Sequence, residues 1–260
     1  FNHLYDDFFN LKKCSSVLFQ NTNTICFNKV LKFNNISYKY PDADRYAVKN
    51  VCFEIYPGQI VGFVGQSGSG KSTTVDLILG LLKPKTGSFT IDGKNVYPDY
   101  VQEWRKNIGY VPQQIYLTDD TLISNIAFGV SSDKVDFNKV VCSSKIADIH
   151  NFIDLELPNK YLTQIGERGV RLSGGQKQRL GIARALYHDP DLLIFDEATS
   201  ALDRLTELSV MNSIHRLSNI KTVIIVAHRM VTVQSCDIIY LFDNGKIVDS
   251  GTYNELVRRN

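Results

Sequence analysis

The chain has 260 residues, 43% of them hydrophobic and 22% charged, and a formal net charge of +2 at pH 7. This length suffices for one large or two small domains with a real core, and the small net charge argues against a nucleic-acid partner. A run of about 18 apolar residues, which a transmembrane helix needs, does not occur, so we expect no membrane span within the chain. The five cysteines lack any Cys-x-x-Cys or zinc-type spacing and are typical of reduced thiols in a cytosolic protein.

The N-terminal part of the chain changes character near residue 30. Residues 1–30 are aromatic and polar, and they are either a short helix with a linker or a frayed terminal tail. Apolar and polar residues then alternate over residues 30–40 and 51–55, which predicts two short strands.

A glycine-rich segment carries the first chemical signal. Residues 60–64 are apolar enough for a buried strand, and residues 65–72 read GQSGSGKS, the pattern G-x-x-x-x-G-K-[ST]. Glycines allow several backbone N–H groups to point at a phosphate, while Lys71 reaches the β- and γ-phosphates and the Ser72 hydroxyl binds Mg²⁺. The alternative is a flexible Gly/Ser turn between a strand and a helix.

The following segment is expected to be a helix, because apolar residues recur at helical spacing from Val75 to Leu82 and Pro84 stops the pattern. Residues 89–96 contain two short apolar runs around Asp-Gly and predict a hairpin. Residues 118–186 favour helices.

A second glycine-rich segment precedes the last of these helices. Ser173 and two glycines come just before the predicted helix 177–187, which makes its N-terminus a second anion-binding site. This segment has no lysine of its own, so we expect it to complete the site of another molecule. An N-capped helix with a tight turn explains the same residues equally well.

Two acidic residues follow a buried apolar strand at residues 192–195. Asp196 suits Mg²⁺ coordination, and Glu197 is placed to polarise an attacking water. The alternative is a pair of solvated acids at a strand exit. The apolar run 222–227 predicts another strand of a parallel core sheet, followed by a hairpin over 238–248 and a short helix at 255–259.

The whole set of motifs resembles the ATPase domain of ABC (ATP-binding cassette) transporters, over nearly all of residues 31–260. The matching segments are GQSGSGKST (65–73), VPQQ (111–114), LSGGQ (172–176), LLIFDE (192–197), SALD (200–203) and VAHR (226–229). The resemblance implies an α/β fold, namely a P-loop NTPase (RecA-like) core with an antiparallel β subdomain and an inserted α-helical signature subdomain at roughly 118–186. Residues 1–30 are then a linker from a membrane domain.

The resemblance also implies roles for individual residues. Lys71, Gln113, Glu197 and His228 are the expected catalytic residues, with Glu197 as the base and His228 on the γ-phosphate. The expected ligands of Mg²⁺ are Ser72, Gln113 and Asp196. The expected nucleotide-binding residues are Tyr40, stacking on adenine, then Gly65, Gln66, Ser67, Gly68, Ser69, Gly70, Lys71, Ser72 and Thr73, and, for the ATP of a partner copy, Ser173, Gly174, Gly175, Gln176 and Asp203.

Four of these assignments have structural alternatives. His228 follows a buried strand and fits a satisfied core histidine, while Tyr40 fits one more strand aromatic. Gln113 follows a proline and fits a turn, and Asp203 fits a helix N-cap.

The resemblance implies a head-to-tail homodimer around two ATP molecules, attached to a transmembrane domain at the cytoplasmic face of the inner or plasma membrane. Residues 166–169 (GERG) resemble the loop by which exporters contact their membrane domain, so we expect the C-terminal ATPase domain of a half-transporter. The transported substrate, such as a lipid or lipid-linked sugar, is not encoded here. The alternatives are an importer subunit, a soluble ABC ATPase acting on DNA or ribosomes, and a nucleotide-binding regulator that does not hydrolyse ATP.

Overall fold

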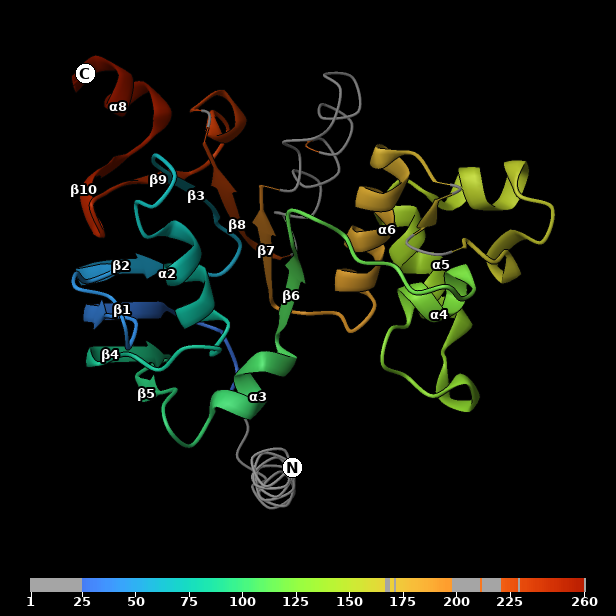
Figure 1. The fold of residues 1–260 in the computed structure, drawn as a ribbon, viewed down its shortest axis with the longest axis horizontal. Helices are drawn as coiled ribbons and strands as arrows, with labels where there is room; N and C mark the ends of the chain where they lie inside the picture. The colour runs from blue at the N-terminus through green and yellow to red at the C-terminus, as the bar shows by residue number, and fades with distance from the viewer. Residues whose placement is uncertain are drawn as a thin grey trace.

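The computed structural model describes residues 25–166, 169–170, 172–197, 211, 221–228 and 230–259. Its strands form two sheets (Figure 1). The first sheet is antiparallel, in the order β2-β1-β4-β5, with β1 Leu31–Tyr38, β2 Val48–Ile55, β4 Thr86–Ile91 and β5 Lys94–Asn95. The alternation over 30–40 therefore predicts β1 correctly, and the Asp92–Gly93 hairpin is confirmed as the β4–β5 pair.

The second sheet has the order β10-β9-β3-β8-β7-β6 and is parallel except for its edge strand β10. Its strands are β3 Ile60–Val64, β6 Ile108–Val111, β7 Leu192–Asp196, β8 Thr222–Ala227, β9 Ile238–Asp243 and β10 Lys246–Gly251. Every residue of β3 and β8 is buried, because both faces of this sheet are covered. The apolar runs at 60–64, 192–195 and 222–227 are confirmed as its central strands.

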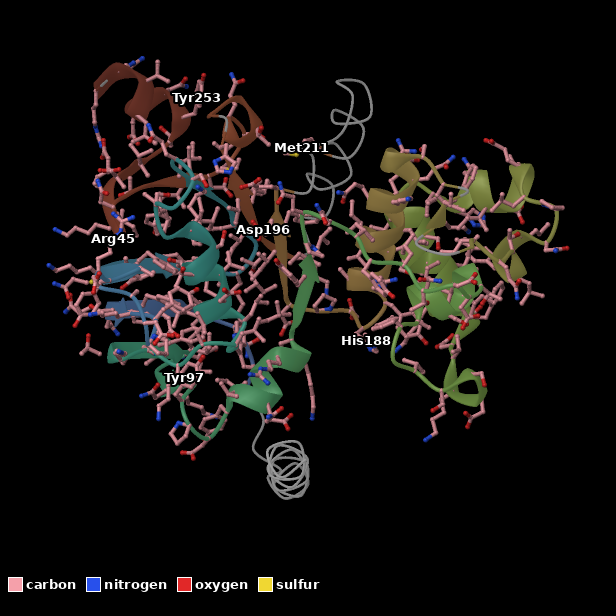
Figure 2. The ribbon with its side chains drawn as sticks, in the orientation of Figure 1. Arg45, Tyr97, His188, Asp196, Met211 and Tyr253 are labelled. Atoms are coloured by element: carbon pink, nitrogen blue, oxygen red, sulfur yellow. The ribbon has the colours of Figure 1, made fainter. Side chains whose placement is uncertain are left out.

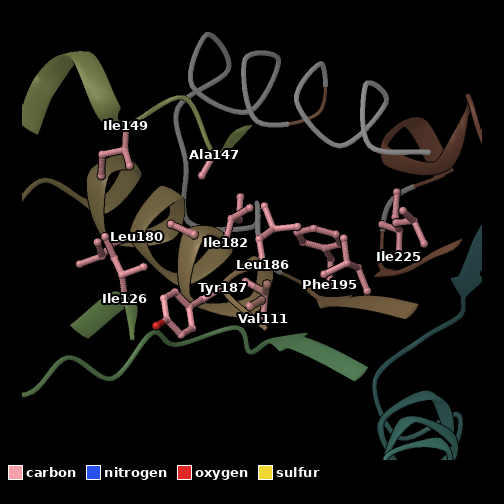
Figure 3. Packing of buried hydrophobic residues seen from close by; sticks show 14 of the residues in the cluster. Val111, Ile126, Ala147, Ile149, Leu180, Ile182, Leu186, Tyr187, Phe195 and Ile225 are labelled. Atoms are coloured by element: carbon pink, nitrogen blue, oxygen red, sulfur yellow. The ribbon is translucent and has the colours of Figure 1, made fainter. Parts of the chain in front are cut away.

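Two hydrophobic cores lie on the two faces of the parallel sheet. One contains helix α2 (Lys71–Ile78), the antiparallel sheet and strand residues such as Phe63 and Ile194. The other contains strand residues such as Phe195 and Ile225 together with the helices of residues 122–186 (Figure 3). The sheet that carries the phosphate loop is therefore held from both sides.

The remaining helices are α3 Val101–Lys106, α4 Leu122–Ile126, α5 Phe137–Ile146, α6 Gly174–Leu186 and α8 Tyr253–Arg259. Shorter helical turns lie at Ser132–Lys134, Phe152–Glu156, Lys160–Leu162 and Met230–Val233. Helices α4, α5 and α6 form a group beside the sheets, entered after β6 and left before β7 (Figure 1). No helix in the described part of the chain is long and apolar enough to cross a membrane.

Helix α2 ends earlier than its apolar spacing predicts. Gly80 has a φ of +70°, which stops the helix. Side chains from a later segment donate hydrogen bonds to the carbonyl groups at its end. The Trp104 indole donates to the Ile78 carbonyl at 2.7 Å, and the Arg105 guanidinium donates to the Gly80 carbonyl. The end of the helix is thus fixed by residues far away in the sequence.

The segment just before β1 packs on the same part of the fold. The backbone N–H groups of residues 28–30 donate to the Asp92 carboxylate, and these bonds lower the pKa of that carboxyl against the opposing effect of burial. Phe27 lies edge-on against Trp104, with ring centroids 6.2 Å apart. Residues 25–30 therefore contact the fold directly, while residues 1–24 lie outside the described chain.

Candidate functional site

The phosphate loop joins the end of β3 to the start of α2. Gly70 caps the helix with a φ of +104°, a conformation that favours glycine. The Lys71 side chain is 4% exposed and folds under the loop, where its Nζ donates to the carbonyls of Gly65 at 2.7 Å and Gln66 at 2.9 Å. Burial lowers the pKa of Lys71, and the charges of Glu197 and Asp196 oppose that effect. The loop therefore surrounds one buried cation.

A cavity of about 920 Å³ opens over this loop. Three segments and two acid–base residues line it: the loop before β2, the phosphate loop, the β9–β10 hairpin, Glu197 and His228. The lining residues are Tyr40, Ala43, Arg45, Tyr46, Ala47, Lys49, Ser67, Gly68, Gly70, Lys71, Ser72, Thr73, Glu197, His228, Asp243, Asn244, Gly245, Lys246 and Val248. Its volume and its mixture of aromatic, backbone and basic groups suit a nucleotide.

Tyr40 lies at one end of this cavity. Its hydroxyl is 3.4 Å from Thr73 Oγ1, and its ring meets the Tyr38 ring edge-on at 5.0 Å between centroids. The side chain is 40% exposed, so part of the ring is open to a ligand. Arg45 and Tyr46 line the same cavity and were missed by the sequence reasoning, because no motif marks the loop that carries them.

Glu197 is the centre of a small hydrogen-bonded cluster. Gln113 Nε2 donates to its Oε2 at 3.0 Å, and His228 Nε2 contacts its Oε1. The other ring nitrogen of His228 lies 3.2 Å from the Gly65 carbonyl, which links the cluster to the phosphate loop. Glu197 itself has a φ of +51°, a strained conformation for this residue type. Three predicted catalytic residues thus meet beside the fourth, Lys71.

Asp196 ends β7 (Figure 2) and accepts a hydrogen bond from the Tyr110 hydroxyl at 3.1 Å. Burial raises the pKa of the Asp196 carboxyl, the Tyr110 bond lowers it, and the neighbouring Glu197 raises it further. Two adjacent carboxylates in a half-buried site favour a bound cation, and oxygen donors of this kind suit Mg²⁺. Asp196, Ser72 and Gln113 all carry oxygen donors of the type that Mg²⁺ prefers.

The predicted second anion site lies at the start of α6. Ser173 caps this helix: its Oγ accepts the Gln176 N–H at 3.3 Å, and Gln176 Oε1 accepts the Ser173 N–H at 2.8 Å. Ser173 and Gly174 are exposed, and none of residues 173–176 belongs to the lining of the cavity. Within the described part of the chain, these residues are not brought to the phosphate loop. Asp203 lies outside the described residues, as do Glu167 and Arg168 of the GERG segment.

Two further contacts connect the site to its surroundings. The Gln178 side chain, on α6, donates to the backbone carbonyl of Gln113 at 3.2 Å, so the signature helix touches the segment that bears a catalytic candidate. Tyr110 reaches Asp196 because β6 pairs with β7, with Tyr110 opposite Ile194. Sequence reasoning missed both, since neither contact follows from a local pattern, although Gln178 comes only two residues after the LSGGQ motif.

Comparisons with known proteins agree with this geometry. A family model described as ABC transporter matches residues 48–200. The chain is 42% identical over 229 residues to an ATP-dependent lipid A-core flippase of Saccharophagus degradans, covering 88% of this chain and 38% of the relative. It is 41% identical over 230 residues to ABC transporter B family member 22 of Arabidopsis thaliana, covering 88% of this chain and 19% of the relative.

A solved structure of a bacterial Atm1-family ABC exporter with ATP bound superposes with a TM-score of 0.83 and 38% identity, covering 92% of this chain and 41% of that chain. This likeness confirms the predicted fold class, a P-loop NTPase with mixed α/β sheets. The chain spans only about a fifth to two fifths of the length of these relatives.

Proposed function

The chain belongs to the ABC transporter family, and from this premise we propose that it hydrolyses ATP to power an exporter. As an ATPase domain of that family it binds ATP. The single observation that carries the proposal is the Glu197 carboxylate, held by Gln113 and His228 at the wall of the phosphate-loop cavity. The names of the relatives, a lipid A-core flippase and an Atm1-family exporter among them, favour export over import.

The described side chains suggest how the reaction proceeds. Lys71 exchanges its bonds to the loop carbonyls for the β- and γ-phosphates of ATP, where its charge stabilises the transition state. Glu197 accepts a proton from the attacking water, while Gln113 and His228 each fix one oxygen of its carboxylate. A bound Mg²⁺, held by Asp196, Ser72 and Gln113, would neutralise charge on the phosphate oxygens.

We further propose that two copies assemble head to tail, each closing the nucleotide site of the other. The support is positional: Ser173 and Gly174 are exposed at a helix N-terminus, and the cavity over the phosphate loop is lined without them. Backbone N–H groups at such a helix start suit the γ-phosphate of a nucleotide bound by a second copy. Tyr40 is proposed as the residue that stacks on adenine.

The partner that links hydrolysis to transport is proposed to be a transmembrane domain, at the cytoplasmic face of a membrane. A hollow of about 590 Å³ on the helical group supports this. Phe128 and Leu162 line it and are 49% and 66% exposed, and Asp119 and Asp120 add negative charge. A lipid or lipid-linked sugar is the proposed transported substrate, on the strength of the flippase relatives.

The substitution Glu197→Gln tests the proposal. It keeps the shape of the side chain but removes the base, so we expect the rate of phosphate release to fall by about two orders of magnitude or more. ATP affinity is expected to persist, and the chain should accumulate as a stable ATP-bound dimer in size-exclusion chromatography.

The matched control is Glu103→Gln on α3, which removes only the ion pair with the exposed Lys106. This variant is expected to keep the turnover of the wild type. Wild-type turnover by Glu197→Gln would overturn the assignment of the base.

A further inference from the structure

The turn of the β9–β10 hairpin lies against the phosphate loop. The Gly245 N–H donates to the Ser69 carbonyl at 3.0 Å, and the Gly245 carbonyl accepts the Lys49 N–H at 2.7 Å. One glycine thus joins the phosphate loop on one side to β2 on the other. The residues of the β9–β10 turn come from the C-terminal part of the chain, and they belong to no nucleotide-binding motif.

The contact leaves no space for a side chain. Gly245 is buried, has a φ of +76°, and a Cβ added there would lie 2.8 Å from the Ala47 carbonyl oxygen. A Cβ on Gly70 would lie 2.6 Å from that same oxygen and 3.2 Å from Gly245 Cα. The Ala47 carbonyl is therefore enclosed between a glycine of the phosphate loop and a glycine of the hairpin.

The β4–β5 hairpin has a similar turn, with Asp92–Gly93 in place of Asn244–Gly245, but lacks this contact. Asp92 and Gly93 have φ values of +51° and +84°, close to those of Asn244 (+47°) and Gly245 (+76°). Gly93 is exposed, and a Cβ added there meets nothing within 4 Å. Turn geometry alone therefore explains Gly93, whereas Gly245 is also constrained by the Ala47 carbonyl and by its hydrogen bond to the phosphate loop.

We infer that Gly245 is a positioning residue for ATP binding, acting through the backbone of Ser69 and Gly70. By fixing this side of the loop, the turn keeps the loop's N–H groups directed at the phosphates before the nucleotide arrives. This inference rests on the proposed ATP site and adds a residue to it that does not contact the reacting atoms.

The test compares Gly245→Ala with Gly93→Ala in the full 260-residue chain. Both variants place alanine at a positive φ, so both carry the same kind of backbone strain. Both are therefore expected to melt at a lower temperature than the wild type. Only Gly245→Ala displaces the phosphate loop. We expect its Kd and KM for ATP to rise about tenfold, the size of a lost loop hydrogen bond or two, with a smaller change in kcat.

Gly93→Ala is expected to keep the wild-type Kd, measured by calorimetric titration at a temperature where both variants are folded. An unchanged Kd for Gly245→Ala would overturn the inference, as would an equal rise in both variants. A wild-type chain that binds no ATP would instead contradict the proposed function.

Should Gly245→Ala fail to fold, amide hydrogen exchange of the wild-type chain decides the matter. The Gly245 amide is expected to be protected, and added ATP should slow its exchange together with that of residues 69–71, leaving Gly93 unchanged. Exchange of the Gly245 amide at the unprotected rate, with and without ATP, would count against the inference.

Discussion

At the scale of single residues, Glu197 owes its position to contacts that are distant in the sequence. Its partner Gln113 lies 84 residues earlier, and its backbone N–H donates to the Val226 carbonyl at 3.1 Å on the neighbouring strand. A glutamate with positive φ carries strain of the order of 1 kcal/mol, which the surrounding bonds must offset. A strained acid held at a cavity wall is typical of catalytic sites rather than of a solvated strand exit.

Cys236 provides a prediction at the same scale. Its thiol is 6% exposed, and burial raises its pKa to about 12 from the ordinary value of 9.0. The unfolded chain releases this proton at a lower pH than the folded chain, so the thiol contributes stability that is fully present below the ordinary pKa of 9.0 and is lost as the pH rises toward about 12. We therefore expect the difference in Tm between the wild type and Cys236→Ala to shrink between pH 7 and pH 10.5.

The control is Cys142→Ala, which removes an exposed thiol. Its difference in Tm from the wild type should not depend on pH over the same range. The Tm values are measured by circular dichroism. A difference in Tm between the wild type and Cys236→Ala that stays constant with pH would contradict the raised pKa of this thiol.

At the scale of elements, the sequence predicts those whose signal is local. The apolar run at 222–227 coincides with β8, and the paired runs at 238–248 coincide with the β9–β10 hairpin. Strand β6 was not predicted, because it has only four residues and includes Gly109. A Cβ on Gly109 would lie 2.7 Å from the Ala185 carbonyl oxygen, so the close approach of the C-terminal end of α6 requires a glycine here.

The end of α2 yields a prediction at the scale of elements. Trp104 is fully buried, and its indole N–H satisfies the Ile78 carbonyl at the end of the helix. Trp104→Phe keeps an aromatic ring beside Phe27 and Phe89 but leaves this carbonyl without its donor. We expect the free energy of unfolding to fall by about 1–3 kcal/mol in urea denaturation.

Tyr116→Phe serves as the control, because this side chain is 65% exposed and its loss of a polar group is compensated by water. Its free energy of unfolding should stay within error of the wild type. The same result for Trp104→Phe would mean that the indole bond does not hold the end of α2.

At the scale of the whole molecule, sequence reasoning located the parts of the site but not how they meet. The glycine pattern marks the phosphate loop, and the acids after an apolar strand mark Asp196 and Glu197. The contact of Tyr110 with Asp196 depends on the pairing of β6 with β7, and the place of Gly245 depends on the packing of the β9–β10 turn against the phosphate loop and β2. Such arrangements follow from tertiary packing, which no local periodicity encodes.

The two cores place the phosphate loop and the start of α6 in separate parts of the chain. The phosphate loop lies where β3 meets α2, in the core shared with the antiparallel sheet, whereas α6 belongs to the core on the opposite face of the parallel sheet. Ser173, at the start of α6, is therefore built into the other half of the molecule from Lys71. A head-to-tail dimer is the arrangement that brings one surface of each kind together twice.

This arrangement predicts complementation between two inactive variants. Lys71→Ala removes the cation of the phosphate loop, and Ser173→Ala removes the cap of α6, so each homodimer has two defective sites. In a mixed dimer, the phosphate loop of the Ser173→Ala chain meets the intact α6 of the Lys71→Ala chain, which restores one complete site. With random pairing of equal amounts, we expect about a quarter of the wild-type ATP hydrolysis, because half the dimers are mixed and each has one intact site of two.

Phosphate release measured for each variant alone and for the mixture checks this expectation. The control mixes the Ser173→Ala chain with a chain that carries both substitutions. Every dimer in this mixture lacks a complete site, so ATP hydrolysis should not return. Recovery in the first mixture alone requires the two surfaces to come from different chains. If the Ser173→Ala chain by itself hydrolyses ATP at the wild-type rate, the start of α6 takes no part in the site. That result would contradict the proposed head-to-tail dimer.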